Sequence, residues 1–213
     1  MPLIIDKAQE ADIPKLLDIM YTAFADDPWD RIMFPQIPPP DRRGLTLAQW
    51  RDEVSVDPHT AFMKVVDTDL NESIAFARWH IYRTERPESE WKRAEAKGWD
   101  EGTNVEAANE FYYKIHEKRE KVMGGKPHCC LNMLATHPYH QRRGAGRMLL
   151  RWGTDVADEA KTFPCYLEAT PVGQHLYQSA GFEHVETLDM DLSKWGGEGI
   201  YYHYVMVRPA KGI

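Results

Sequence analysis

Apolar residues recur with two different periods in the first part of the chain, and each period predicts one type of element. Between residues 13 and 24 they return at every third or fourth position, which is typical of an amphipathic helix. Residues 61–67 and 73–82 are short runs rich in β-branched and aromatic side chains, joined by a polar turn. We therefore expect a helix followed by an antiparallel hairpin. A short strand beginning at residues 3–5 and a short helix at residues 45–54 are also expected.

The second half of the chain alternates strand and helix patterns. Strand patterns at residues 129–136 and 165–169 flank an amphipathic helix pattern at residues 144–160. Another helix is expected at residues 172–180, where Gly181 suits the end of a helix. The last two strands are expected at residues 185–192 and 201–207. In the long helix, the residues expected to face the core are Met148, Leu149, Trp152, Val156 and Ala160.

Residues 83–126 interrupt this order. They carry charges of both signs, and residues 105–123 have a helical pattern. We interpret the segment as an insertion whose charges most simply form a solvated face. The alternative is a lid over a substrate, because long insertions in compact domains are often functional.

Composition narrows the class of protein. With 213 residues and 43% hydrophobic content, the chain is expected to form one globular domain over residues 1–213, and no apolar run approaches the ~20 residues of a membrane span. Lys and Arg number 26 against 33 Asp and Glu, giving a net charge of -7, so we expect neither a nucleic-acid nor a membrane partner. Three cysteines, an odd number, favour a reducing compartment, most simply the cytoplasm.

One turn stands out as a candidate anion site. Residues 141–146 read Gln-Arg-Arg-Gly-Ala-Gly and lie between a strand pattern and the start of a helix. A helix N-terminus presents unpaired N–H groups and a partial positive charge, and glycines allow close approach, so the turn suits a pyrophosphate. The alternative is a flexible turn with arginines on a wet helix face. A dinucleotide fingerprint is excluded because Leu149 stands where its last glycine belongs.

Two segments resemble the GCN5-related N-acetyltransferase (GNAT) superfamily. Residues 134–150, LATHPYHQRRGAGRMLL, resemble its acetyl-CoA signature, and residues 176–182, LYQSAGF, resemble the Leu-Tyr-x-x-x-Gly-Phe segment that follows. The resemblance implies a mixed α/β (α+β) fold of the acyl-CoA N-acyltransferase type, with a central, mostly antiparallel mixed sheet flanked by helices. Residues 129–182 would form its acetyl-CoA-binding core. The loop pattern and the glycine-rich final hairpin resemble uncharacterised fungal members.

The resemblance also implies roles for particular residues. The backbone of Leu134, Ala135 and Thr136 would pair with the pantetheine arm of acetyl-CoA, and Tyr177 would protonate the departing thiolate, a role that a phenol suits. The alternative for Tyr177 is an aromatic side chain that staples a helix end. The residues implied around the pyrophosphate are Gln141, Arg142, Arg143, Gly144, Ala145, Gly146 and Arg147.

The general base stays open at the level of sequence. Asn132 cannot serve, and Cys130 could, although a buried thiol has a raised pKa. Glu168 and His80 are the other candidates, and deprotonation through water is equally compatible. The histidines and cysteine near residues 128–140 match no standard zinc spacing, so we expect no metal.

These inferences predict an acetyl-CoA-dependent N-acetyltransferase that acts on a primary amine of a small molecule, as a monomer or homodimer. Acidic groups at Asp26, Asp27 and Asp30 suit a cationic amine. The aromatic residues expected beside them are Trp29, Phe34 and Trp79. The alternatives are a protein or peptide N-acetyltransferase and a CoA-binding sensor module without catalysis.

Overall fold

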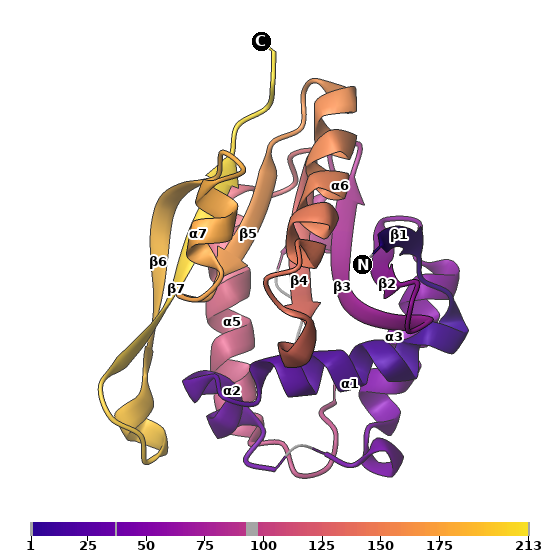
Figure 1. Cartoon of the computed structure of the whole chain (residues 1–213). Coiled ribbons are helices and arrows are strands. Elements are labelled where there is room, and N and C mark those ends of the chain that lie inside the picture. Colours follow the sequence, from indigo (N-terminus) through magenta and orange to yellow (C-terminus); the bar gives the residue numbers. More distant parts are fainter. Residues whose placement is uncertain (1, 37, 93–97, 213) are drawn as a thin grey trace.

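The computed structural model describes residues 2–36, 38–92 and 98–212. Seven strands in these ranges form one mixed sheet in the order β1-β2-β3-β4-β5-β7-β6 (Figure 1). All neighbouring strands are antiparallel except β4 and β5, which are parallel. The strands are β1 (Leu3–Lys7), β2 (Thr60–Asp67), β3 (Glu72–Tyr82), β4 (His128–Thr136), β5 (Cys165–Ala169), β6 (Glu183–Asp191) and β7 (Ile200–Arg208). The expected fold class is confirmed.

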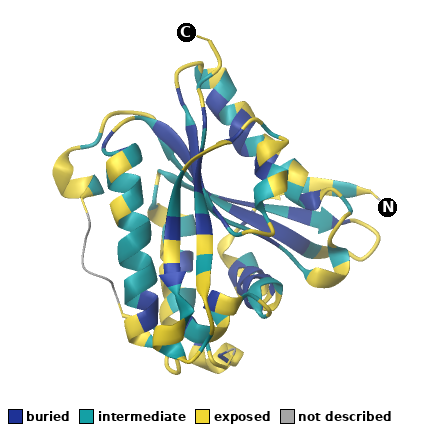
Figure 2. Cartoon of the chain, turned by 90° about the vertical axis from the view of Figure 1, so that its left-hand side faces the viewer, coloured by how far each residue is buried: buried dark blue, intermediate teal, exposed yellow. Residues whose placement is uncertain are grey.

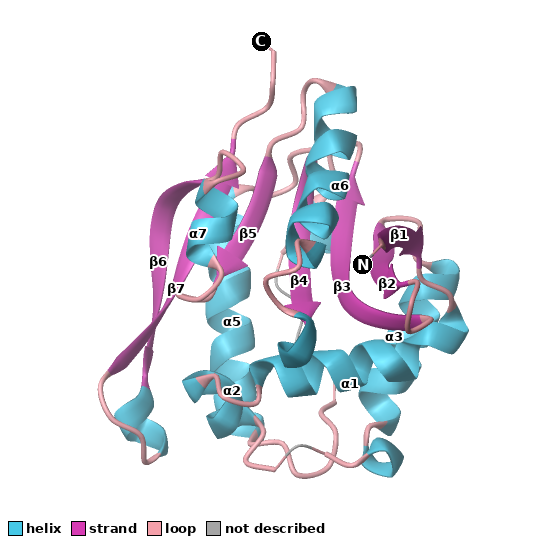
Figure 3. Ribbon diagram, viewed as in Figure 1, coloured by secondary structure: helices cyan, strands magenta, loops and turns pink. Residues whose placement is uncertain are grey.

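Helices cover both faces of the sheet (Figure 3). They are α1 (Ile13–Phe24), α2 (Pro28–Met33), α3 (Gly44–Val56), α4 (Glu88–Trp91), α5 (Val105–Val122), α6 (Ala145–Ala160) and α7 (Gln174–Gln178). Short 3-10 turns occur at Glu10–Asp12, Pro40–Arg42, Pro138–His140 and Leu192–Trp195. The predicted helix at residues 13–24 and the strand at residues 165–169 have the expected bounds. No helix in the described ranges combines the length and apolar character needed to cross a membrane.

Alternation along β3 separates the two faces. Ala75, Ala77 and Trp79 pack in the core beneath α6, whereas Phe76 packs with α1 and α3 on the opposite face. We call these the α6 face and the α5 face, because α5 continues the second layer over β5, β7 and β6. Successive residues of a strand point to opposite faces, so each face has its own core.

The buried stripe of α6 differs from the expected one. The fully buried positions include Leu149, Gly153 and Ala157. Four expected positions are only partly buried, namely Met148, Trp152, Val156 and Ala160. A Cβ atom on Gly153 would lie 2.2 Å from the nearest ring atom of Trp79. The absence of a side chain at Gly153 therefore lets the helix rest directly on this indole.

The segment expected as a solvated insertion is packed on the sheet. The helix predicted at residues 105–123 is α5, and its surface is mostly of intermediate burial in Figure 2. Lys118 and Lys121 form ion pairs with Glu186 of β6, at 2.8 and 2.7 Å. The interpretation of its charges as a solvated face therefore holds only in part, because some of these cations tie the helix to the sheet.

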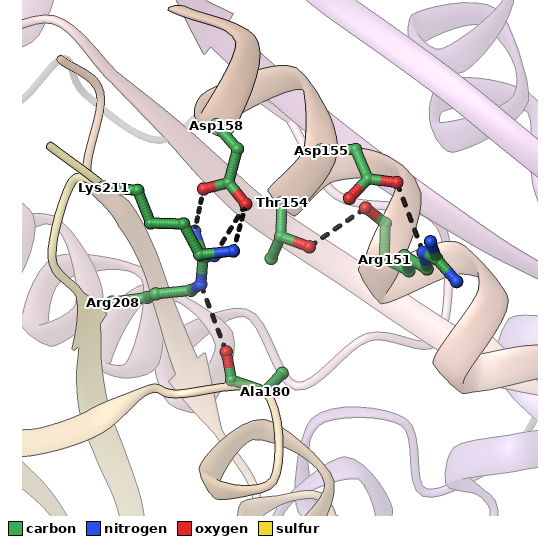
Figure 4. Close-up of polar contacts among 7 residues, drawn as sticks. All are labelled: Arg151, Thr154, Asp155, Asp158, Ala180, Arg208 and Lys211. Atoms are coloured by element: carbon green, nitrogen blue, oxygen red, sulfur yellow. Dashed lines mark hydrogen bonds and ion pairs between the residues drawn. The ribbon is translucent and has the colours of Figure 1, made fainter. Parts of the chain in front are cut away.

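An ion-pair cluster joins the end of α6 to β7 (Figure 4). Arg208 of β7 donates to both carboxylate oxygens of Asp158, at 2.7 and 2.9 Å, and its Nε donates to the carbonyl oxygen of Ala180 at 3.1 Å. Lys211 adds a second cation at 2.7 Å from Asp158. These contacts fix α6, the turn after α7 and β7 relative to one another.

Candidate active site

The sheet opens between β4 and β5. The two strands pair only from Cys129↔Cys165 to Leu131↔Leu167. β4 then bulges at Asn132, since Leu131 pairs with Trp79 while Met133 pairs with Arg78 of β3. Beyond this point β4 stays with β3 and β5 stays with β7, so their ribbons diverge in Figure 1. The bulge turns β4 away from its parallel neighbour.

The part of β4 beyond the bulge has one edge without a paired strand among the described residues. Leu134, Ala135 and Thr136 pair with β3 on their other edge. An extended ligand can therefore form backbone hydrogen bonds along β4, in the way that a peptide adds to a sheet edge. This is where the sequence places the pantetheine-binding residues.

The turn between β4 and α6 presents backbone donors. Arg142 has φ 62° and Gly144 has φ 92°, and no side chain caps the helix that begins at Ala145. The N–H groups of Ala145, Gly146 and Arg147 lie in the first helical turn, where they have no intrahelical acceptor. They form a positive N-terminus suited to a phosphate.

The side chains of the turn divide into two groups. Arg143 donates to the carboxylate of Asp67 at 2.7 Å, and this hydrogen bond lowers the pKa of Asp67. Gln141 donates to the carbonyl oxygen of Thr136 at 3.5 Å. Arg142 and Arg147 are exposed. Arg143 and Gln141 thus hold the turn in place, while Arg142 and Arg147 have their side chains in solvent.

Tyr177 lies on α7, which packs against the start of α6 through Leu176. Its ring contacts Phe182, with 6.1 Å between centroids, and a Cβ atom on Gly173 would lie 2.8 Å from it. Burial raises the pKa of Tyr177 well above 10. The hydroxyl therefore stays protonated at neutral pH, as an acid that donates to a thiolate requires.

On the α5 face, Glu168 is the first residue of β5 beyond the part that pairs with β4. Arg119 of α5 holds its carboxylate with two hydrogen bonds, of 2.7 and 2.8 Å. The Glu168 side chain is 4% exposed. Its nearby charge raises the pKa of Arg119, although burial acts in the opposite direction. Glu168 is thus engaged as half of a largely buried ion pair.

Cys130 and His80 lie in the closed part of the sheet, where they pair with each other across β3 and β4. Burial raises the pKa of Cys130 to about 11. Burial also lowers the pKa of His80 well below its usual value, and the positive charges of Arg78 and Arg119 lower it further. The thiol is therefore neutral at pH 7, and the imidazole resists protonation.

A carboxyl pair at the start of α2 contacts β7. Asp27 caps α2 by accepting from the N–H groups of Trp29 and Asp30, at 2.9 and 3.2 Å, and it also accepts from the hydroxyl of Tyr201 on β7. Burial and the charge of Asp27 raise the pKa of Asp30 well above its usual range. The pair thus holds a proton more readily than isolated carboxylates do.

The acidic and aromatic residues expected around an amine are only partly brought together. Asp26 is exposed and paired with Arg31 at 2.5 Å. Trp79 is fully buried on the α6 face, so its expected place beside Asp27 and Asp30 was wrong. Trp29 is buried on α2, where it contacts Phe111 of α5 with 6.1 Å between ring centroids.

His203 was missed by the sequence analysis. It is buried on β7, between Phe111 and Tyr201, at 4.9 and 5.1 Å between ring centroids. Its neighbour Asp27 was expected as an acidic group near the amine, and the Asp-Pro pattern could also have identified it as a helix start. Nothing in the local pattern distinguishes His203 from other strand residues.

Comparisons with known proteins agree with this geometry. Residues 107–184 match the family of the acetyltransferase (GNAT) domain. A curated relative, the probable acyltransferase SID5 of Ajellomyces capsulatus, is 30% identical over 93 residues, which are 44% of this chain and 62% of the relative. The match thus spans less than two thirds of that relative's length.

Solved structures show the same fold. The arylalkylamine N-acetyltransferase 2 of Aedes aegypti has a TM-score of 0.72 at 12% identity, covering 98% of this chain and 99% of that one. The PaiA N-acetyltransferase of Thermoplasma acidophilum, in complex with coenzyme A, has a TM-score of 0.55 at 13% identity, with 98% and 99% coverage. The domain match at residues 107–184 and the shared fold agree with the resemblance of the sequence to the GNAT superfamily.

Proposed function

We propose that this protein transfers an acetyl group from acetyl-CoA directly to a primary amine of a small molecule. The opening between β4 and β5 carries the proposal, because it joins an edge of β4 that no described strand pairs with to a helix N-terminus without a side-chain cap. An acyl carrier with an extended amide arm and a pyrophosphate matches these two features in this order. No covalent enzyme intermediate is required.

The cofactor would be held mainly by backbone groups. Leu134, Ala135 and Thr136 would pair with the pantetheine arm, and the first-turn N–H groups of α6 would donate to the pyrophosphate. Arg142 and Arg147 would add positive charge, while Arg143 would hold the turn through Asp67. Bound acetyl-CoA supplies the thioester whose carbonyl carbon the amine attacks.

Proton transfer to the leaving group is assigned to Tyr177. Its hydroxyl forms no hydrogen bond with the described residues, and its raised pKa keeps the proton in place until a thiolate forms. Because the conjugate acid of a thiolate has a pKa of only about 8.5, the transfer is completed when the second proton of the acetylated nitrogen replaces the one that Tyr177 has given up.

The comparisons support the cofactor and the acceptor class. One structural neighbour binds coenzyme A, and another acts on arylalkylamines. Asp30 lies beside the partly buried ring of Phe34, and Asp27 is close by, so negative charge and aromatic surface occur together. This combination suits an amine that carries an apolar group.

Cofactor binding can be tested with two variants at one position. A Cβ atom on Gly146 would make only ordinary contacts, at 3.5 Å from Leu134 and Leu176. We therefore expect Gly146→Ala to keep its affinity for CoA in calorimetry, whereas Gly146→Glu places an anion at the pyrophosphate and abolishes binding. CoA should also bind more tightly than pantetheine, with affinity falling as salt rises. Parental affinity in Gly146→Glu would refute the assignment.

Turnover can be tested by measuring CoA release from acetyl-CoA with a panel of arylalkylamines, aliphatic diamines and peptides. Release with small amines supports the proposal. Release with peptides alone would establish the alternative of a peptide acetyltransferase. CoA binding without turnover on any acceptor would favour a sensor module.

A further inference from the structure

The α5 face holds a buried imidazole that the proposed function has not used. His203 is 6% exposed, and its Nδ1 is buried without a hydrogen-bond partner in the described part of the chain. Buried polar atoms in folded proteins nearly always have a partner from protein, water or ligand. An unpaired ring nitrogen at this place therefore points to a ligand or water that donates to it.

The register of the strands places His203 beside the opening of the sheet. Glu168 pairs with Val205, and Ala169, the last residue of β5, pairs with Tyr204. His203 is thus two residues from Val205 on the same face, diagonal to Glu168 and just beyond the end of β5. Because β4 and β5 have separated by this row, the imidazole borders the opening from the α5 face.

The charged groups that act on the pKa of His203 are carboxylates. The carboxylates of Asp27 on α2 and Glu168 on β5 raise its pKa, while burial, the larger effect, lowers it. Asp30 lies next to Asp27, and Tyr201, on the same strand as His203, donates to Asp27. From α5, the ring of Phe111 contacts the imidazole at an interplanar angle of 53°. Arg119 of α5 is paired with Glu168.

We infer that His203 is the proton acceptor for the acceptor amine, and that the Asp27–Asp30 carboxyl pair binds this amine as its ammonium ion. This inference rests on the proposed function. The carboxyl pair supplies the negative charge that attracts the cation, and the neighbouring imidazole is neutral and free to accept one of its protons. The acidic groups then stabilise the imidazolium that forms.

The proton balance is complete with water as the final acceptor. The ammonium ion loses two protons overall as its nitrogen bonds to the acetyl carbon and the carbon–sulfur bond breaks. One proton passes to His203 and from there to water. The other replaces the proton that Tyr177 gives to the thiolate. The products are the amide, CoA and one proton in solution.

His80 provides a matched comparison. Its Nε2 is also buried without a partner in the described chain, but it lies in the closed part of the sheet. The positive charges of Arg78, Arg119 and Arg86 oppose an imidazolium there. A protonated His80 is thus disfavoured by the groups that surround it, in contrast to His203.

The test compares His203→Gln with His80→Gln on an amine that the parent protein acetylates. We expect His203→Gln to lower kcat by ~10²–10⁴-fold and to remove the acidic limb of the kcat/KM profile against pH, with CoA affinity unchanged. His80→Gln should keep kcat within about threefold. In His203→Ala, added imidazole should restore part of the lost rate. Asp30→Asn should raise KM for cationic amines without changing the affinity for CoA.

The outcomes distinguish a failure of the role of His203 from a failure of the proposed function. A His203→Gln variant that keeps more than about half of kcat with the parental pH profile overturns the role of His203. If His80→Gln loses its rate and His203→Gln keeps it, the proton acceptor lies in the closed part of the sheet. This result would also overturn the role of His203. If His203→Gln lowers Tm strongly, failure of imidazole to rescue His203→Ala decides against the role. A parent protein that binds CoA but acetylates no amine refutes the proposed function itself.

Discussion

The two faces of the sheet bury different chemistry. On the α6 face, Trp79, Leu131 and Leu167 pack against the apolar stripe of α6. On the α5 face, the ion pairs Arg78–Glu53 and Arg119–Glu168 lie at the rows where β4 and β5 separate, at N···O distances of 2.7 Å. An apolar core tolerates changes of pH, whereas a buried polar network is stable only when every member is paired. The α6 face, apart from Tyr177, is therefore a scaffold, and the α5 face is where buried groups can accept a proton.

Breaking one ion pair should give the largest loss of stability. Arg119→Met leaves the Glu168 carboxylate buried without its cation, and we expect the free energy of unfolding to fall by about 3–5 kcal/mol. The double variant Arg119→Met/Glu168→Leu removes both charges and should recover most of this loss. Urea unfolding of the parent, both single variants and the double variant measures the coupling. Equal losses in the single and double variants would show that the pair does not act as a unit.

On the α6 side, Tyr177→Phe should give the largest loss of kcat that leaves the stability unchanged. The change keeps the ring against Phe182 and removes only the hydroxyl, so we expect kcat to fall ~10²–10⁴-fold, roughly 3–5 kcal/mol of barrier. CoA affinity and Tm should stay close to those of the parent, since the hydroxyl forms no hydrogen bond with the described residues that the change would remove. A variant that retains about half of kcat or more would leave Tyr177 as a packing residue.

The pH dependence of stability should trace to the α5 face. Burial lowers the pKa of His128 to about 4, while an unfolded histidine titrates near pH 6.5. The unfolded state therefore binds the proton more readily, so this stabilisation is full above pH 6.5 and is lost as the pH falls toward 4. Between pH 7.5 and 4.5 the loss is about 2.5 kcal/mol. His128→Gln should reduce the pH dependence of urea unfolding by this amount, and a variant with the parental pH dependence would contradict the assignment.

The smallest expected effect tests the close contact on the α6 face. Gly153→Ala would place a Cβ atom 2.2–2.6 Å from ring atoms of Trp79, and the rigid indole must shift. We expect a loss of about 1–3 kcal/mol and a Tm lower by roughly 2–10 °C. Gly146→Ala in the same helix has Cβ contacts of 3.5 Å or more and is the matched control. Calorimetric melting without CoA distinguishes them, and equal Tm values would show that α6 does not depend on this contact.

Much of the unit formed by β4, the glycine turn and α6 could be predicted because its parts are close in sequence. The strand, the turn at residues 141–146 and the helix follow one another, so their periodicity and glycines are visible in one window. The precise buried stripe of α6 was predicted less well. It is decided by contact with Trp79 on β3, which is far away in sequence, and by the lack of a side chain at Gly153.

The amino-acid sequence by itself determined the order of strands and helices, the glycine turn and the position of Tyr177, because these depend on local propensity and spacing. Only the tertiary structure decided which charged residues meet. Arg119 reaches Glu168 from a helix that was expected to be an insertion, and Tyr201 meets Asp27 across nearly the whole chain. His203 acquires its surroundings in the same way. Such pairings depend on strand register and on how helices pack on a sheet, and neither leaves a periodic signal in the sequence.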